Sequence, residues 1–162
     1  MIQAVRKEID KEKRNTLKRE TLPGVVFGSE PQQSVRQAAV AGEPNGVLCL
    51  DFDDIPADTL EAVKLEISAV PYVFAAGLSA SNTGIFALTA YEGTPDLKTL
   101  IGAMQADFSY TIDKKCSDLC RLRFVTLDPD LIIKDEVVPA TLSERVVPGS
   151  CPEIIGATSN TA

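Results

Sequence analysis

The sequence predicts an α+β fold, in which helices pack on one face of a mixed or antiparallel sheet. Three observations support this prediction. An apolar strand over residues 47–52 is followed by a helical segment over 59–68, and two further strands, 72–79 and 84–91, are joined by a four-residue loop. Because so short a loop makes its two strands antiparallel neighbours, the order indicates a split βαβ unit that contains a hairpin.

The chain before this unit is predicted to form a surface helix and a short strand. Residues 2–20 contain no Gly or Pro and carry only a thin apolar stripe, which is typical of a helix with little buried surface. A Pro-Gly pair ends this helix, and residues 25–27 are predicted as a short strand. Residues 30–40 are expected to form a short helix, before a turn at 42–46.

N-cap residues predict where two helices begin. Asp58 is the expected N-cap of the helix over 59–68, with Glu61 as its capping-box partner. A further helix over about 95–108 is expected to take Thr94 as its N-cap.

The last part of the chain changes in composition. A basic loop at 112–118 precedes a predicted strand at 121–127, and a turn at 128–130 precedes a short strand at 131–133. Pro, Ser, Gly and Thr then dominate, which favours little structure in 145–162. We therefore expect three parts: an N-terminal surface helix over 1–20, one domain over 21–138, and a tail or linker over 139–162.

Composition and charge exclude several classes of function. The 162 residues include no histidine, which excludes His-based triads, imidazole bases and His metal ligands. The net charge of −7 argues against a simple nucleic-acid coat, which needs a basic face. The charged N-terminus lacks the apolar centre of a signal peptide, and no apolar run approaches the roughly 18–20 residues that cross a bilayer. We therefore expect a cytoplasmic protein with no membrane partner.

Two aspartates follow the strand at 47–52 and form the first candidate site. Strand side chains alternate between faces, so Asp51 and Asp53 are expected to point to the same side. Two adjacent carboxylates repel unless a proton or cation lies between them, and Mg²⁺ prefers oxygen ligands of this kind. The pattern predicts a metal site for phosphoryl or nucleotidyl transfer. The alternative is a strand end with solvated aspartates, Asp54 among them.

A basic cluster around a single acid is the second candidate site. Lys114, Lys115, Arg121 and Arg123 lie within ten residues around Asp118, in a part of the chain that is otherwise acidic. Such a cluster could hold a triphosphate. The alternative is an exposed loop whose charges are solvated.

The four cysteines are expected to be free thiols. They stand at positions 49, 116, 120 and 151. A zinc site would need four ligands, and the chain offers neither histidine nor a second close Cys pair.

Three segments in order resemble a known family. They are 46–53 (GVLCLDFD), 78–85 (LSASNTGI) and 113–130, which begins DKKCSDLCRLRF. Together they resemble the primase-like domain called the VirE N-terminal or BT4734-like domain, of the archaeo-eukaryotic primase and primase-polymerase superfamily. The lead-in 17–25, with its lysine and its Leu-Pro before the first strand, is also similar. The resemblance spans about residues 5–135.

The resemblance implies an RRM-like, primase-polymerase-like core and a template-dependent nucleotidyltransferase that acts in DNA replication. It implies Mg²⁺ or Mn²⁺ held by Asp51, Asp53 and Asp118, which would be the catalytic carboxylates. Its implied partners are nucleoside triphosphates, a single-stranded DNA template and a helicase domain or protein. The nucleotide-binding residues that it implies are Ser79, Ser81 and Gly84 of a Ser-x-Ser-x-x-Gly loop, with Lys114, Arg121 and Arg123 facing phosphate or template.

The chain departs from the family pattern in the Ser-x-Ser loop. Phe86 stands where the family usually has Lys or His, so a cationic nucleotide contact is missing and weaker triphosphate binding is expected. Arg121 or Lys114 could supply that charge. One alternative is therefore a catalytically weakened, nucleic-acid-binding accessory module. Another is an Asp-x-Asp phosphohydrolase of the haloacid-dehalogenase type, but that fold needs a parallel sheet, and the predicted hairpin argues against it.

Overall fold

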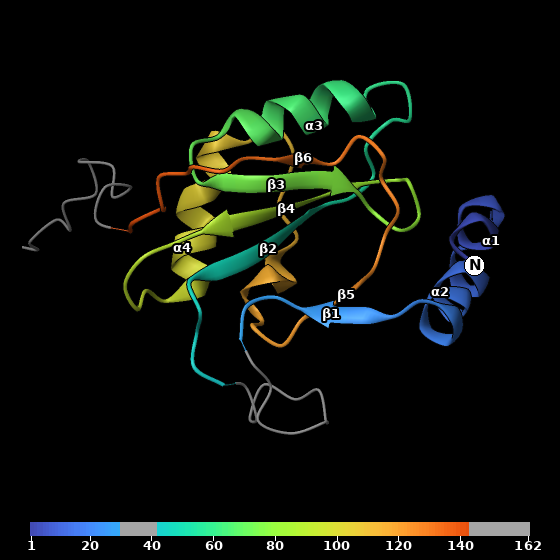
Figure 1. The fold of residues 1–162 in the computed structure, drawn as a ribbon, viewed down its shortest axis with the longest axis horizontal. Helices are drawn as coiled ribbons and strands as arrows, with labels where there is room; N and C mark the ends of the chain where they lie inside the picture. The colour runs from blue at the N-terminus through green and yellow to red at the C-terminus, as the bar shows by residue number, and fades with distance from the viewer. Residues whose placement is uncertain (30–41, 143–162) are drawn as a thin grey trace, which may run out of the picture.

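The computed structural model describes residues 1–29 and 42–142 (Figure 1). It confirms the predicted α+β class; the helix expected at 30–40 and the tail at 145–162 lie outside the described residues. The elements are α1 (Ile2–Lys7), α2 (Lys11–Thr21), β1 (Gly24–Val26), β2 (Val47–Phe52), α3 (Leu60–Ala69), β3 (Val73–Leu78), β4 (Ile85–Ala90), α4 (Leu97–Met104), β5 (Leu122–Phe124) and β6 (Ile132–Ile133), with 3₁₀ turns at Gln105–Asp107 and Lys114–Ser117.

The central sheet has four strands in the order β2-β4-β3-β6, and every neighbouring pair is antiparallel. Since β2 and β3 are both antiparallel to β4, they run parallel to each other with β4 between them. Helix α3 connects β2 to β3, which is the strand order of a split βαβ unit. The β3–β4 hairpin forms as predicted, so the sheet is not the parallel one that the phosphohydrolase alternative requires. Strands β1 and β5 form a separate antiparallel ribbon, which lies beside the sheet in Figure 1.

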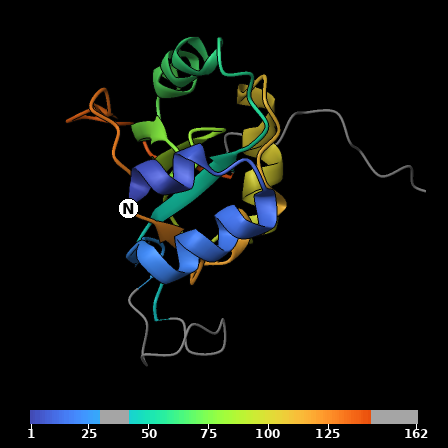
Figure 2. The same ribbon diagram turned by 90° about the vertical axis from the view of Figure 1, so that its right-hand side faces the viewer.

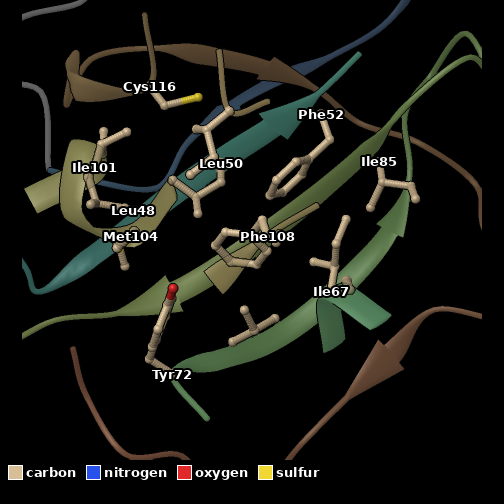
Figure 3. Packing of buried hydrophobic residues seen from close by; sticks show 14 of the residues in the cluster. Leu48, Leu50, Phe52, Ile67, Tyr72, Ile85, Ile101, Met104, Phe108 and Cys116 are labelled. Atoms are coloured by element: carbon tan, nitrogen blue, oxygen red, sulfur yellow. The ribbon is translucent and has the colours of Figure 1, made fainter. Parts of the chain in front are cut away.

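The apolar core lies on the face of the sheet that α3 and α4 cover. Leu48, Leu50 and Phe52 alternate along β2 and point into this core, as Figure 3 shows. The Phe52 and Phe108 rings pack with their centroids 5.0 Å apart. Ala140 also belongs to the cluster and pairs with Tyr91, so packed structure continues two residues past the expected domain boundary at 138.

The opposite face of the same strands is polar at one end. Residues directly opposed in an antiparallel pair share a face, and Asp51 of β2 is opposed by Phe86 of β4, with Cys49 opposed by Leu88. The β1–β5 ribbon approaches this face, because Arg123 of β5 contacts both Asp51 and Phe86. The candidate site is therefore on the face that the apolar core does not use.

The N-terminal segment forms two helices where the sequence predicted one. Helix α1 ends at Lys7, and α2 begins after Asp10, whose carboxylate accepts a hydrogen bond from the Lys13 amide at 2.9 Å. An internal N-cap of this kind starts a new helix without any Gly or Pro. Val5 is fully buried, so α1 is held by packing.

Two predicted helix caps are wrong by one or two residues. Thr59, not Asp58, precedes the first residue of α3, and it makes no side-chain cap hydrogen bond. Asp96, not Thr94, caps α4 by accepting from the Thr99 amide at 2.9 Å. A carboxylate caps more strongly than the threonine two residues earlier because it also accepts from the Thr99 hydroxyl, at 2.6 Å.

Within the described ranges, 1–29 and 42–142, no helix has the length and apolar character needed to span a bilayer.

Candidate functional site

A polar pocket of about 220 Å³ lies where β2 ends. The end of β2, the β3–β4 loop, β5 and α2 each contribute to its lining. Figure 2 shows α2 near the viewer, in front of the strands. We call it the acid–arginine pocket, and its lining residues are Lys18, Asp51, Asp53, Ser79, Ala80, Ser81, Arg121, Leu122, Arg123 and Phe124.

Asp51 pairs with two arginines in this pocket. Its carboxylate lies 3.1 Å from the Arg121 guanidinium and also contacts the Arg123 guanidinium. Arg121 makes a second ion pair with Asp113, at 2.7 Å. Burial raises the pKa of Asp113, but the Lys115 amide and the Arg121 guanidinium outweigh it, so that the pKa lies below its ordinary value. The two arginines of the basic cluster therefore form an ion-pair network with Asp51 and Asp113, whereas Lys114 and Lys115 are exposed.

The backbone of Asp51 is held from the outer edge of β2. Its amide donates to the Cys116 Sγ at 3.2 Å, and its carbonyl accepts from the Asp113 amide at 2.9 Å. Burial raises the pKa of Cys116 to about 12, so this thiol stays neutral and packs as part of the core. The segment after α4 therefore fixes the position from which the Asp51 side chain leaves the strand.

The Arg123 guanidinium lies next to Phe86, the position at which the sequence lacks the expected cation. Phe86 is only 7% exposed, and the Arg123 guanidinium lies over its ring at 5.3 Å from the centroid. This is cation–π geometry. Arg121, one of the two cations expected to compensate for Phe86, also lines the pocket, whereas Lys114 does not.

Asp53 lies at the mouth of the pocket and is exposed. The neighbouring Gly84 is needed because a Cβ there would lie 2.4 Å from the Phe52 carbonyl oxygen and 3.2 Å from Asp53 Oδ1. Gly84 therefore lets the β3–β4 loop approach the acid pair closely. Asn82 adopts φ of 60°, the left-handed turn conformation that asparagine tolerates.

The serine hydroxyls of the loop reach the same pocket. Ser79 and Ser81 line it, and their hydroxyls share a hydrogen bond of 3.3 Å, while Ser81 shares another with Thr83 at 3.0 Å. The loop is closed by backbone bonds from the Ser79 amide to Gly84 and from the Asn82 amide to Ser79. Two hydroxyls on a fixed turn can donate to phosphate oxygens.

Asp118 and Lys114 lie elsewhere. The Asp118 carboxylate accepts from the Cys120 amide at 3.0 Å, and Asp118 lines a separate recess beside Cys49. Lys114 lines a larger pocket of about 740 Å³ against α4. The described residues contain no cluster of three or more His, Cys, Asp or Glu placed to hold a metal, so the expected convergence of Asp118 with Asp51 and Asp53 is not found.

Lys18 of α2 is a pocket residue that the sequence did not single out for the site. Burial and the nearby Arg14 lower its pKa, while Asp53 acts in the opposite direction. The only sequence signal was its place in the family-like lead-in before the first strand. Lys18 and the end of β2 are distant in the sequence but line the same pocket, which helical periodicity in residues 2–20 could not show.

A second buried carboxylate, Asp128, lies in the segment predicted as a turn. It accepts from the Leu78 amide at 2.8 Å and from the Lys64 ammonium at 3.3 Å. Burial raises the pKa of Asp128, but the amides of Leu78 and Asp130 and the Lys64 charge outweigh it and lower the pKa. Because Leu78 immediately precedes Ser79, this pair anchors the start of the serine loop.

The donor set fits a divalent cation in part. Asp51 and Asp53 supply oxygen ligands at one pocket, which is the chemistry that Mg²⁺ and Mn²⁺ prefer. Asp51 is already neutralised by two guanidiniums, so a cation there requires the arginines to take other anionic partners.

The comparison with protein families now gives the class. The family model described as BT4734-like, N-terminal domain, matches residues 16–132, and the chain belongs to this family. The matched range contains every residue of the acid–arginine pocket. Searches of curated proteins and of solved structures find no match.

Proposed function

We propose that the domain is a primase-polymerase-like nucleotidyltransferase, with an RRM-like core, that binds nucleoside triphosphates with Mg²⁺ or Mn²⁺ and acts in DNA replication. One observation carries the proposal: a single pocket gathers two carboxylates, two guanidiniums, an ammonium and two hydroxyls. Carboxylates suit a divalent cation, and the cations and hydroxyls suit phosphate oxygens. A metal-bound triphosphate is the ligand that uses both sets at once.

The charges of the pocket explain how it would accept this ligand. Arg121 and Arg123 pair with Asp51 in the structure. An incoming triphosphate offers both arginines stronger anionic partners, which frees the Asp51 carboxylate. Asp51 and Asp53 would then hold the divalent cation, which lowers the pKa of an attacking 3′-hydroxyl and neutralises phosphate charge. Lys18 and the Ser79 and Ser81 hydroxyls would orient the phosphates.

A second candidate function is favoured by the position of Asp118. Two-metal transfer in the wider superfamily uses a third carboxylate, and here Asp118 lies outside the pocket. A nucleic-acid-binding accessory module would need the cationic side chains of the pocket to bind phosphates, but it would not need Asp118 as a third metal ligand. In both functions the proposed partners are a single-stranded DNA template and a helicase domain or protein.

A primer-extension assay with Mn²⁺ distinguishes these functions. We expect the wild type to extend a primer on a single-stranded template and Asp53→Asn to lose this activity. Asp54→Asn is the matched control, because Asp54 is exposed, does not line the pocket, and sits at φ of 58°, where asparagine is tolerated. Template binding without extension would favour the accessory module, and equal extension by Asp53→Asn would refute the proposed site.

A further inference from the structure

An apolar groove of about 240 Å³ adjoins the acid–arginine pocket. It lies between the β1–β5 ribbon, the open face of β4 and the segment after β5. We call it the aromatic groove. The lining residues that matter here are Val25, Phe27, Phe86, Arg123, Phe124 and Leu131.

The groove and the polar pocket adjoin each other. Arg123 and Phe124 line both. Arg123 stands between them, with its guanidinium over the Phe86 ring and in contact with the Asp51 carboxylate. A ligand that lies across Arg123 therefore meets charge on one side and aromatic surface on the other.

Gly77 leaves room for the Phe86 ring and the Leu131 side chain at the floor of the groove. Gly77 is opposed to Phe86 across β3 and β4. A Cβ on Gly77 would lie 2.6 Å from Leu131 Cδ1 and 2.8 Å from Phe86 Cε1. The absence of a side chain at this position gives both groups the room that they occupy.

Size and chemistry identify one occupant. Each space alone is smaller than the roughly 300–1,000 Å³ typical of ligand pockets, whereas the two together fall within that range. A ligand that fills both has an anionic end and a flat apolar end. Resting on the proposed function, we propose that the aromatic groove binds the base of the nucleoside triphosphate whose phosphates lie in the acid–arginine pocket.

Phe86, which departs from the family pattern, helps to form the floor of the aromatic groove. A Lys at position 86 would place a charge on the groove floor, whereas the nearly buried Phe86 ring supports the Arg123 guanidinium above it, so the base is expected to stack on this guanidinium. Aromatic surfaces and guanidinium planes both stack on bases with little dependence on sequence. The groove is therefore expected to accept all four bases with similar affinity.

Paired titrations test the base site separately from the phosphate site. Isothermal calorimetry in Mg²⁺ would compare a nucleoside triphosphate with inorganic tripolyphosphate, which lacks the base. We expect the wild type to bind the nucleotide about tenfold more tightly. Phe27→Leu should remove most of this difference and leave tripolyphosphate affinity unchanged. Phe74→Leu is the control, since Phe74 is half-buried in β3 but lines neither space.

The titrations distinguish a failure of the proposed base site from a failure of the proposed phosphate site. Equal affinity for nucleotide and tripolyphosphate in the wild type would overturn the base site and keep the phosphate site. Binding of neither would overturn the proposed function and the base site together. Photo-crosslinking of an azido-nucleotide to the wild type does not depend on a variant's folding, and it should label peptides that contain Phe27 or Phe124. Labelling of these peptides by an azido-oligonucleotide alone would assign the groove to template bases and overturn the proposal.

Discussion

Asp51 and Asp128 are both buried carboxylates paired with cations, but their surroundings differ. The Asp128 and Lys64 side chains are each 2% exposed, and Asp128 also accepts backbone hydrogen bonds from Leu78 and Asp130. The Asp51 side chain is 11% exposed, and its partner Arg121 is 22% exposed at a pocket. The first pair is enclosed by its own hydrogen bonds, whereas the second borders a pocket, where we propose that it exchanges partners when a ligand binds. Burial and pairing are therefore similar in a carboxylate that anchors a loop and in one that we propose binds a metal.

Asp128→Ala should have the largest effect on stability. Among the described residues it leaves the buried Lys64 charge with the exposed Glu61 as its remaining ion-pair partner, and it removes the acceptor of the Leu78 amide. We expect a loss of about 3–5 kcal/mol in the free energy of unfolding, measured by urea denaturation. The double variant Lys64→Met with Asp128→Asn should recover most of it, because it removes both charges and keeps an acceptor. A loss below about 1 kcal/mol for Asp128→Ala would contradict a structural role.

The same pair predicts how stability depends on pH. The pKa of Asp128 is lowered in the folded protein, so its contribution is present above the unfolded value of about 3.9 and is lost as pH falls through the folded pKa. Burial lowers the pKa of Lys64, but Glu61 and Asp128 outweigh this and raise it. Its contribution is therefore present below about 10.4 and is lost as pH rises through the folded value. The free energy of unfolding should be measured against pH for the wild type and for Asp128→Asn. The difference between the two should shrink as the pH falls, and a constant difference below pH 5 would contradict this prediction.

Asp51→Asn should have the smallest effect on stability. In this variant Arg121 keeps its ion pair with Asp113, and Arg123 keeps its cation–π contact with the Phe86 ring. Solvent reaches both guanidiniums. We expect a loss of about 1 kcal/mol, below the cost of breaking a fully buried pair, because both arginines keep a partner and are partly exposed. Urea denaturation beside Asp128→Ala makes the comparison direct. A loss as large as that of Asp128→Ala would mean that Asp51 is also structural.

Local patterns in the sequence predicted most of the scaffold. The apolar run ending in Asp51 gave β2 at its observed bounds, and the short loop after residue 79 correctly indicated the hairpin. Alternation along the strand also predicted that Asp51 and Asp53 point to the same side, and both line the acid–arginine pocket. The errors were in elements that a single side chain decides, such as the break before α2 at Asp10 and the cap of α4 at Asp96.

The candidate site was harder to predict because its contacts join distant segments. The acid pair, the serine loop and the two arginines were named from sequence, and they share one pocket. Asp118 was included by resemblance, but its carboxylate bonds to the local Cys120 amide. The roles of Lys18 and Phe86 depend on how α2 and β5 pack against the sheet, and no periodicity within either segment encodes that packing.

The most direct test of the central claim is a Mn²⁺-binding titration with and without a nucleoside triphosphate. The electron paramagnetic resonance signal of free Mn²⁺ measures the binding. The wild type should bind Mn²⁺ more tightly when the nucleotide is present, because the phosphates release Asp51 from Arg121 and Arg123. Asp53→Asn should weaken this binding by about tenfold or more, as expected for loss of a charged ligand, while Asp54→Asn should match the wild type. Equal Mn²⁺ affinity in the wild type and Asp53→Asn, or no effect of nucleotide, would contradict a metal–nucleotide site in the acid–arginine pocket.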